Sequence, residues 1–184
     1  MNENPKVKRE VLPNVNLPME QAVIAGLLSS PDAIFDVCDR LRAEMFSHSG
    51  IRFVYEAILS LVESGKVVDM LTVENEMRRL DSGMYDKLDG LLFISGMLLD
   101  VRNDKHIRIH ADELVRCYTL RRLVSGLKET EVQAEQPAAD VLALLSGVEQ
   151  LAGTLRGELT RSSSMEEAGK VAARVLERSY QEQT

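Results

Sequence analysis

Apolar side chains recur at helical spacing along most of this sequence. The clearest run lies between residues 51 and 62, at positions i, i+3, i+4, i+7, i+10 and i+11 (Ile51, Val54, Tyr55, Ile58, Leu61 and Val62). That spacing places them on one helical face, and no stretch of convincing length alternates apolar and polar residues as a strand does. We therefore predict an all-α chain: a small globular helical head, an antiparallel helical hairpin and a C-terminal linker helix.

Capping residues mark the first helices of the head. A helix is predicted over residues 20–28, and Ser30 followed by Pro31 is typical of the N-cap and first residue of the next helix. His48 precedes the helix over 51–62, a position typical of a capping or half-buried structural histidine.

The second part of the head is divided in the same way. Gly65 is expected to end the preceding helix, because glycine adopts the left-handed conformation at low cost. Asp69 and Thr72 are alternative N-caps for a helix that ends at 81–83, and a short helix is predicted over about 90–99.

Two long helical patterns follow the head. The first carries an apolar stripe between residues 106 and 135 (Leu114, Cys117, Leu120, Val124 and Leu127). The second carries a longer stripe (Val141, Leu144, Leu145, Val148, Leu151, Leu155 and Leu159). Pro137 is incompatible with a helix interior, so the two patterns predict an antiparallel hairpin.

The final segment predicts a linker helix. Ser164 and Glu167 match a capping box. The residues after it place apolar side chains on one face (Ala168, Val171, Ala172, Val175, Leu176 and Tyr180). We expect this face to dock on another polypeptide segment. The predicted organisation is a polar N-terminal arm (1–16), a globular helical head (17–104), a helical hairpin (105–160) and the linker helix (161–184).

Composition restricts the classes of function. The net charge of −7, the absence of Trp and the aromatic content of 4% argue against a strong nucleic-acid binder that uses the whole chain. No apolar run approaches the roughly 20 residues of a membrane span, and the N-terminus lacks the apolar centre of a secretory signal, so a cytoplasmic location without membrane contact is expected. Cys38 and Cys117 lie far apart and are expected to be small core residues.

Catalytic and metal-binding motifs are weak. Gly65-Lys66 and Gly169-Lys170 both lack the first glycine and the following Ser or Thr of a phosphate-binding loop. His106 and His110 are four residues apart, but no third ligand stands at a characteristic spacing. We expect no catalytic site, cofactor or metal in this chain. A metal-dependent helical hydrolase that uses the two histidines is the least favoured alternative.

A basic stretch at residues 116–124 is a candidate interface. Arg116, Arg121 and Arg122 surround Tyr118 in a helical pattern. They are suited to contact phosphates or an acidic partner surface, although a solvated helix face explains them equally well. A small helical nucleic-acid-binding adaptor is therefore the alternative function.

Three segments resemble the N-terminal domain of bacterial replicative DNA helicases of the DnaB type. The first is 17–28, with matching residues Glu20, Gln21, Val23, Gly26, Leu27 and Leu28. The second is 44–73, with Phe46, Ile58, Leu61, Gly65, Asp69 and Thr72. The third is 105–124, with Ile107, Ala111, Asp112, Arg121 and Leu123. Departures from the family pattern occur at 89–90, at 92–93 and at His110.

The resemblance implies a non-catalytic collar domain. Such a domain self-associates as a dimer, or as a trimer of dimers in a hexamer, and docks primase or a helicase loader. The linker helix would contact the motor domain of an adjacent subunit through four side chains (Val171, Val175, Leu176 and Tyr180). ATP and magnesium would bind only in that motor domain, and DNA would pass through the full-length ring. A fragment of such a helicase is favoured over a stand-alone relative.

Overall fold

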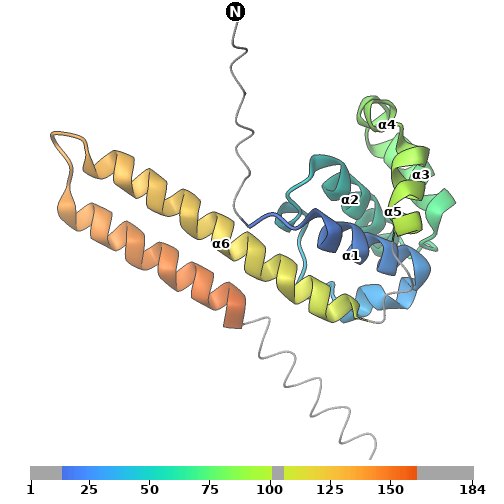
Figure 1. Ribbon diagram of the computed structural model, residues 1–184, viewed down its shortest axis with the longest axis horizontal. Helices are drawn as coiled ribbons and strands as arrows, with labels where there is room; N and C mark the ends of the chain where they lie inside the picture. Colours follow the sequence, from blue (N-terminus) through green and yellow to red (C-terminus); the bar gives the residue numbers. More distant parts are fainter. Residues whose placement is uncertain (1–13, 101–105, 161–184) are drawn as a thin grey trace, which may run out of the picture.

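The computed structural model describes residues 14–100 and 106–160, and this part of the chain is helical without strands. The elements are α1 (Leu17–Ser29), the 3-10 helices η1 (Pro31–Asp36) and η2 (Ala43–Met45), α2 (Ser49–Glu63), α3 (Met70–Leu80), α4 (Ser82–Leu88), α5 (Gly90–Asp100), α6 (Ile107–Ala134) and a helix over 141–160. Helices α1 to α5 form a globular head, from which α6 and the 141–160 helix project as an antiparallel hairpin (Figure 1). The predicted all-α class, head and hairpin are confirmed. The predicted linker helix lies outside the described residues.

Helix α2 provides the centre of the head core, as its periodicity predicted. Val54, Tyr55 and Ile58 are fully buried, and the ring of Tyr55 lies 4.8 Å from that of Phe46 between centroids. The Nδ1 atom of His48 accepts hydrogen bonds from the first turn of α2, which confirms its capping role.

A buried carboxylate joins α1 to the start of α2. Glu20 is fully buried, and its oxygens accept hydrogen bonds from the backbone and hydroxyl of Ser47 and from the backbone N–H of His48. A buried charge is tolerated only when its hydrogen-bonding capacity is met. Glu20 therefore fixes the loop from which α2 begins.

Helices α3 and α4 share Asp81. Asp69 caps α3 and Thr72 completes the capping box, so the two residues act together rather than as alternatives. Asp81 ends α3, as predicted, but its side chain also accepts a hydrogen bond from the N–H of Met84 and starts α4. Helix α4 was not predicted, because residues 81–83 indicated only a helix end.

Of two further local predictions, one was confirmed in its position and the other was wrong. Ser30 is the N-cap and Pro31 the first residue of η1, as predicted, although Ser30 makes no side-chain capping hydrogen bond and the element is a 3-10 helix. Cys38 follows η1 and is exposed, whereas Cys117 is buried as expected. Cys38 lies in the turn segment 37–40, where an apolar side-chain type alone does not indicate which residues face the core.

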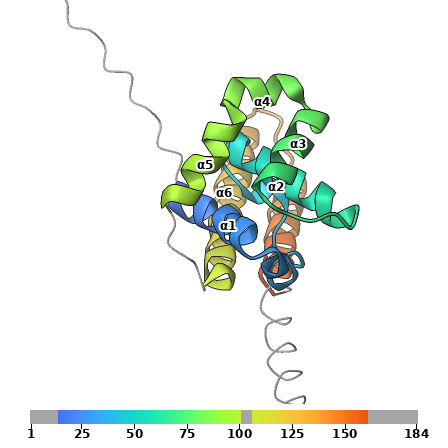
Figure 2. The same ribbon diagram turned by 90° about the vertical axis from the view of Figure 1, so that its right-hand side faces the viewer.

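Helix α6 belongs to both parts of the molecule. Its first turns contribute Ile107, Ala111 and Leu114 to the head core, and its remainder pairs with the 141–160 helix. Figure 2, turned so that the head faces the viewer, shows both hairpin helices behind it. Among the described residues, no helix is long and apolar enough to cross a membrane.

We expect Gly90→Ala to destabilise the head. A Cβ atom at Gly90 would overlap the ring of Tyr85, whose hydroxyl donates to Glu74 at 2.8 Å, so the ring cannot move without loss of that hydrogen bond. Overpacking of this kind lowers the free energy of unfolding by about 1–3 kcal/mol, measurable by urea denaturation. Gly96→Ala in the same helix is the control, because a Cβ there meets open space. Equal stability of the two variants would contradict the prediction.

The Glu76 carboxylate predicts a pH-dependent contribution to stability. Hydrogen bonds from Arg79 and Ser60, each 2.6 Å long, lower the pKa of Glu76 from 4.5 to about 2. A carboxylate with a depressed pKa stabilises the fold above its unfolded pKa and loses that contribution as the pH falls through its folded pKa.

We therefore expect Glu76→Gln to be less stable than the parent chain near neutral pH, with a difference that shrinks as the pH falls from 4.5 to about 2. Urea denaturation across this range measures the difference. Glu63→Gln is the control, because Glu63 is exposed at the end of α2. A difference that does not change with pH would refute the assignment.

Candidate functional site

The hairpin exposes a series of apolar side chains. Six of them, from both helices, are between 43% and 76% exposed (Leu127, Val132, Val141, Leu142, Leu145 and Leu159). The predicted stripe of the second helix is only partly covered, because Leu155 is buried while Val141 and Leu145 are exposed. Several large exposed apolar side chains on one pair of helices are typical of an interaction surface. We call these six side chains the hairpin surface.

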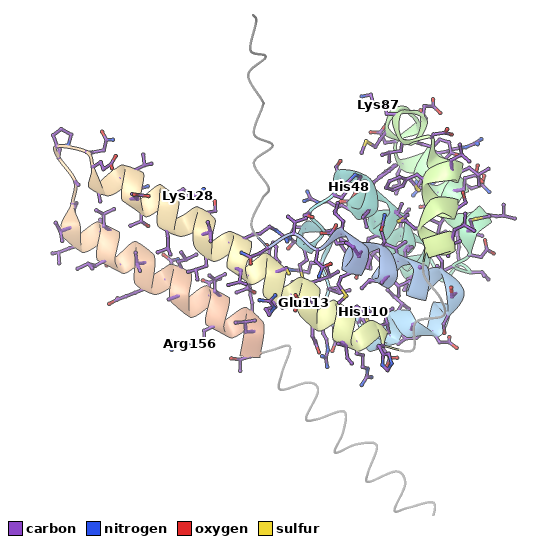
Figure 3. All side chains as sticks on the ribbon, in the orientation of Figure 1. His48, Lys87, His110, Glu113, Lys128 and Arg156 are labelled. Carbon is purple, nitrogen blue, oxygen red and sulfur yellow. The ribbon has the colours of Figure 1, made fainter. Side chains whose placement is uncertain are left out.

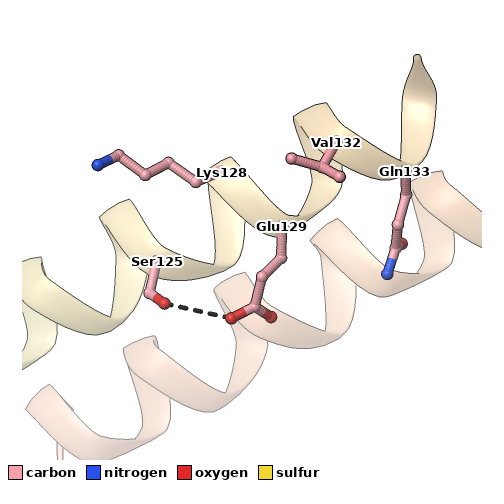
Figure 4. Close-up of a pocket in the computed structure, with 5 residues that line it drawn as sticks. All are labelled: Ser125, Lys128, Glu129, Val132 and Gln133. Atoms are coloured by element: carbon pink, nitrogen blue, oxygen red, sulfur yellow. Dashed lines mark hydrogen bonds between the residues drawn. The ribbon is translucent and has the colours of Figure 1, made fainter.

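Two shallow hollows adjoin the hairpin surface. One, of about 350 Å³, lies along the outer half of α6 (Figure 4) and is lined by Ser125, Lys128, Glu129, Val132 and Gln133. The other, of about 310 Å³, lies at the hairpin turn and is lined by Gln133, Gln136, Ala138, Ala139, Asp140, Ala143 and Leu144. Both are open to solvent, a shape that suits side chains of a protein partner better than an enclosed cofactor.

The predicted basic stretch lies at the base of the hairpin, where three guanidinium groups approach Tyr118. The guanidinium carbons of Arg121 and Arg122 are each 5.8 Å from the ring centroid, and that of Arg42 is 6.0 Å away. The structure thus brings together three of the predicted residues, Tyr118, Arg121 and Arg122. It adds Arg42, which comes from the head.

Each predicted arginine has a partner within the chain. Arg121 donates to the carbonyl oxygens of Asn14 at 2.9 Å and Met45 at 2.6 Å, so it ties α6 to the head. Arg122 donates to Glu158 of the second hairpin helix at 2.9 Å. These contacts give both guanidinium groups a structural role.

Arg116 is separately paired with Glu113 by two hydrogen bonds of 2.7 and 2.8 Å. The hydrogen bonds to Glu113 raise the pKa of Arg116, and the same pair lowers the pKa of Glu113. Because its guanidinium group is paired with Glu113, Arg116 contributes little free positive charge to a site for phosphates. Figure 3 shows Glu113 beside the head and Lys128 far along the hairpin.

The sequence analysis did not identify Arg42 and Glu158. Arg42 lies in an irregular segment just before η2, and Glu158 is a polar residue on a helix whose apolar stripe carried the prediction. Their partners are distant in sequence, so no local spacing could have indicated them.

The other candidates add no second site. Among the described residues, no three His, Cys, Asp or Glu side chains are placed so that they could hold a metal ion. Four predicted interface residues (Val171, Val175, Leu176 and Tyr180) lie outside the described part of the chain.

Comparisons with known proteins agree on one family. A family model described as "DnaB-like helicase N terminal domain" matches residues 12–116. The replicative DNA helicase DnaB of Rhodothermus marinus is 30% identical over 138 residues, which cover 75% of this chain and 14% of that protein. The helicase DnaB of Mycobacterium leprae is 34% identical over 114 residues, which cover 62% of this chain and 18% of that protein. The chain thus spans less than a fifth of either relative's length.

Solved structures show the same fold. The N-terminal domain of DnaB helicase from Mycobacterium tuberculosis superposes with a TM-score of 0.70 at 28% identity, covering 78% of this chain and 99% of that one. A DnaB-like replicative helicase, described with its interactions with primase, superposes with a TM-score of 0.56 at 19% identity, covering 72% of this chain and 31% of that one. At that identity the second match supports the fold alone.

We expect Arg121→Ala to destabilise the chain much more than Arg116→Ala. Arg121→Ala leaves the carbonyl groups of Asn14 and Met45 without the charged donor that ties α6 to the head, which lowers the free energy of unfolding by about 1.5–3 kcal/mol. Arg116→Ala removes an exposed ion pair within one helix, and such pairs contribute little because water screens them. Urea denaturation of both variants measures the difference. Similar losses would show that Arg121 does not hold α6 to the head.

Proposed function

The chain belongs to the family of DnaB-like helicase N-terminal domains, and we propose that it is the non-catalytic collar domain of a replicative DNA helicase. In this role it mediates oligomer assembly and docks primase or a helicase loader during DNA replication. The hairpin surface is the observation that carries the proposal, since six large apolar side chains stay between 43% and 76% exposed on it. Association with a partner removes such apolar side chains from water, which stabilises the complex.

Self-association is the simplest way to cover the hairpin surface. Two helices can bury only their facing sides against each other, so the outer sides of α6 and the 141–160 helix need further partners. A second copy of the chain offers the same surface, and a two-fold axis makes such a contact self-complementary. We propose dimers, or a trimer of dimers in a hexamer, as the assembled form.

The remaining partners rest on the family relationship. Primase enters the proposal through the family, since a DnaB-like replicative helicase with this fold is described with its interactions with primase. Four further features belong to the same proposal: the loader, the docking of the linker helix predicted for 161–184 on a neighbouring motor domain, the passage of DNA through the full-length ring and a cytoplasmic location. ATP and magnesium would act in the motor domain.

The nucleic-acid adaptor gains no support from the basic stretch. Arg116 is paired with Glu113 and Arg122 with Glu158, while Arg121 is held by backbone carbonyl groups. Binding to a phosphate backbone would require these arginines to exchange internal partners for external ones. We therefore favour the protein-interface function.

We expect Leu142→Glu to weaken self-association without unfolding the chain. Leu142 is 76% exposed, and its N–H is capped by Asp140 in the first turn of its helix, where an acidic side chain is favourable. Light scattering coupled to size-exclusion chromatography should show dimers or larger species for the parent chain and a shift toward monomer for the variant.

Leu92→Glu is the matched control for this experiment. Leu92 is 66% exposed and also lies near the start of its helix, but it belongs to α5 of the head. The control should assemble like the parent chain. A parent chain that remains monomeric at high protein concentration would refute the proposal, and equal weakening by the two variants would refute the assignment to the hairpin surface.

A further inference from the structure

One carboxylate at the base of the hairpin joins three parts of the molecule. The Oε1 atom of Glu158, on the 141–160 helix, accepts a hydrogen bond from Arg122 of α6 at 2.9 Å and lies 3.3 Å from the guanidinium group of Arg42 in the head. The side chain of Glu158 is only 12% exposed. A carboxylate with this little access to water depends on its cationic partners for stabilisation.

The two arginines differ in what they connect. Arg122 lies on α6, so its bond to Glu158 acts within the hairpin. Arg42 lies in the head and also donates to Glu44 at 2.8 Å, which fixes its direction. Among the hydrogen bonds and ion pairs of the described residues, the Arg42–Glu158 pair is the one that links the 141–160 helix directly to the head.

Apolar packing holds this helix mainly near its base. Leu155 is buried, and Leu151 packs where α6 has Gly126, whose missing side chain allows the close approach of the two helices. Toward the turn, Val141 and Leu142 are 66% and 76% exposed and hold the helix weakly. The helix therefore packs mainly against α6, and its direct link to the head is the ion pair of Glu158 with Arg42.

We propose that Glu158 is a latch that fixes the angle between the second hairpin helix and the head. In the closed state its carboxylate bridges Arg42 and Arg122. The arginine side chains are 43% and 38% exposed, so water can solvate them when the bridge opens, whereas Glu158 must move outward to be solvated. Loss of the Arg42 contact frees the helix from the head while the hairpin stays paired through Arg122 and Leu151.

The latch is tested by hydrogen exchange on the full 184-residue chain, read by mass spectrometry. A helix that loses its contact with the head loses tertiary support and unfolds locally more often. We therefore expect Glu158→Gln to speed exchange of the amides in 144–160 by about tenfold and to leave α2 unchanged. Glu149→Gln is the matched control, because Glu149 is an exposed carboxylate on the same helix. It should exchange like the parent chain.

A double-mutant comparison assigns the effect to the Arg42 pair. If Arg42 acts through Glu158, the double variant Arg42→Gln/Glu158→Gln should exchange the amides in 144–160 no faster than the single variant Glu158→Gln does. The latch is refuted if the amides in 144–160 exchange equally fast in Glu158→Gln and in the Glu149→Gln control. It is also refuted if Arg42→Gln speeds this exchange as much in the Glu158→Gln background as in the parent chain. Faster exchange in α2 as well would also refute it, because Glu158 would then support the whole fold.

This inference does not rest on self-association. All variants are compared at one protein concentration, after light scattering has shown that they share one oligomeric state. A monomeric parent chain would refute the proposed assembly and leave the exchange comparison intact, so the two proposals fail separately.

Discussion

Helix α6 belongs to both the head and the hairpin, and this double role constrains the rest of the structure. Its 28 residues correspond to about 42 Å of helix, longer than the small head can cover. The first turns complete the head core through Ile107, Ala111 and Leu114. The remainder has one partner helix in the described chain, and two helices alone leave their outer sides in water. The hairpin surface follows from this geometry, and so does the need for a partner.

Charged side chains in this protein act mainly at joints between elements. Glu20 ties α1 to the loop before α2, Arg121 ties α6 to the head, and Glu158 ties the second hairpin helix to both. Each is a partly or fully buried ionic group whose hydrogen bonds have demanding geometry, so each fixes an orientation as well as adding stability. A basic stretch that looks in sequence like a binding site is used here to hold the hairpin in place.

Predictions that depend on interactions between residues close in sequence were more accurate than the others. The face of α2, the end of that helix near Gly65 and the break near Pro137 depend on neighbouring residues, and the structure confirms them. Helix α4 was missed because one aspartate, Asp81, serves both as the end of one helix and as the cap of the next. The predicted burial of Cys38 was wrong because the turn segment 37–40 has no periodicity from which to infer a buried side.

The sequence by itself determined the helical class, most helix limits, the hairpin and the family resemblance, since all of these depend on spacing and capping within a few residues. The tertiary structure alone decided which apolar residues of the hairpin stay uncovered and which charges meet. Val141 and Leu155 belong to the same predicted stripe, yet one is exposed and the other buried, a difference that spacing along one helix cannot indicate. Arg42, Arg122 and Glu158 come from distant segments, and only folding places them together.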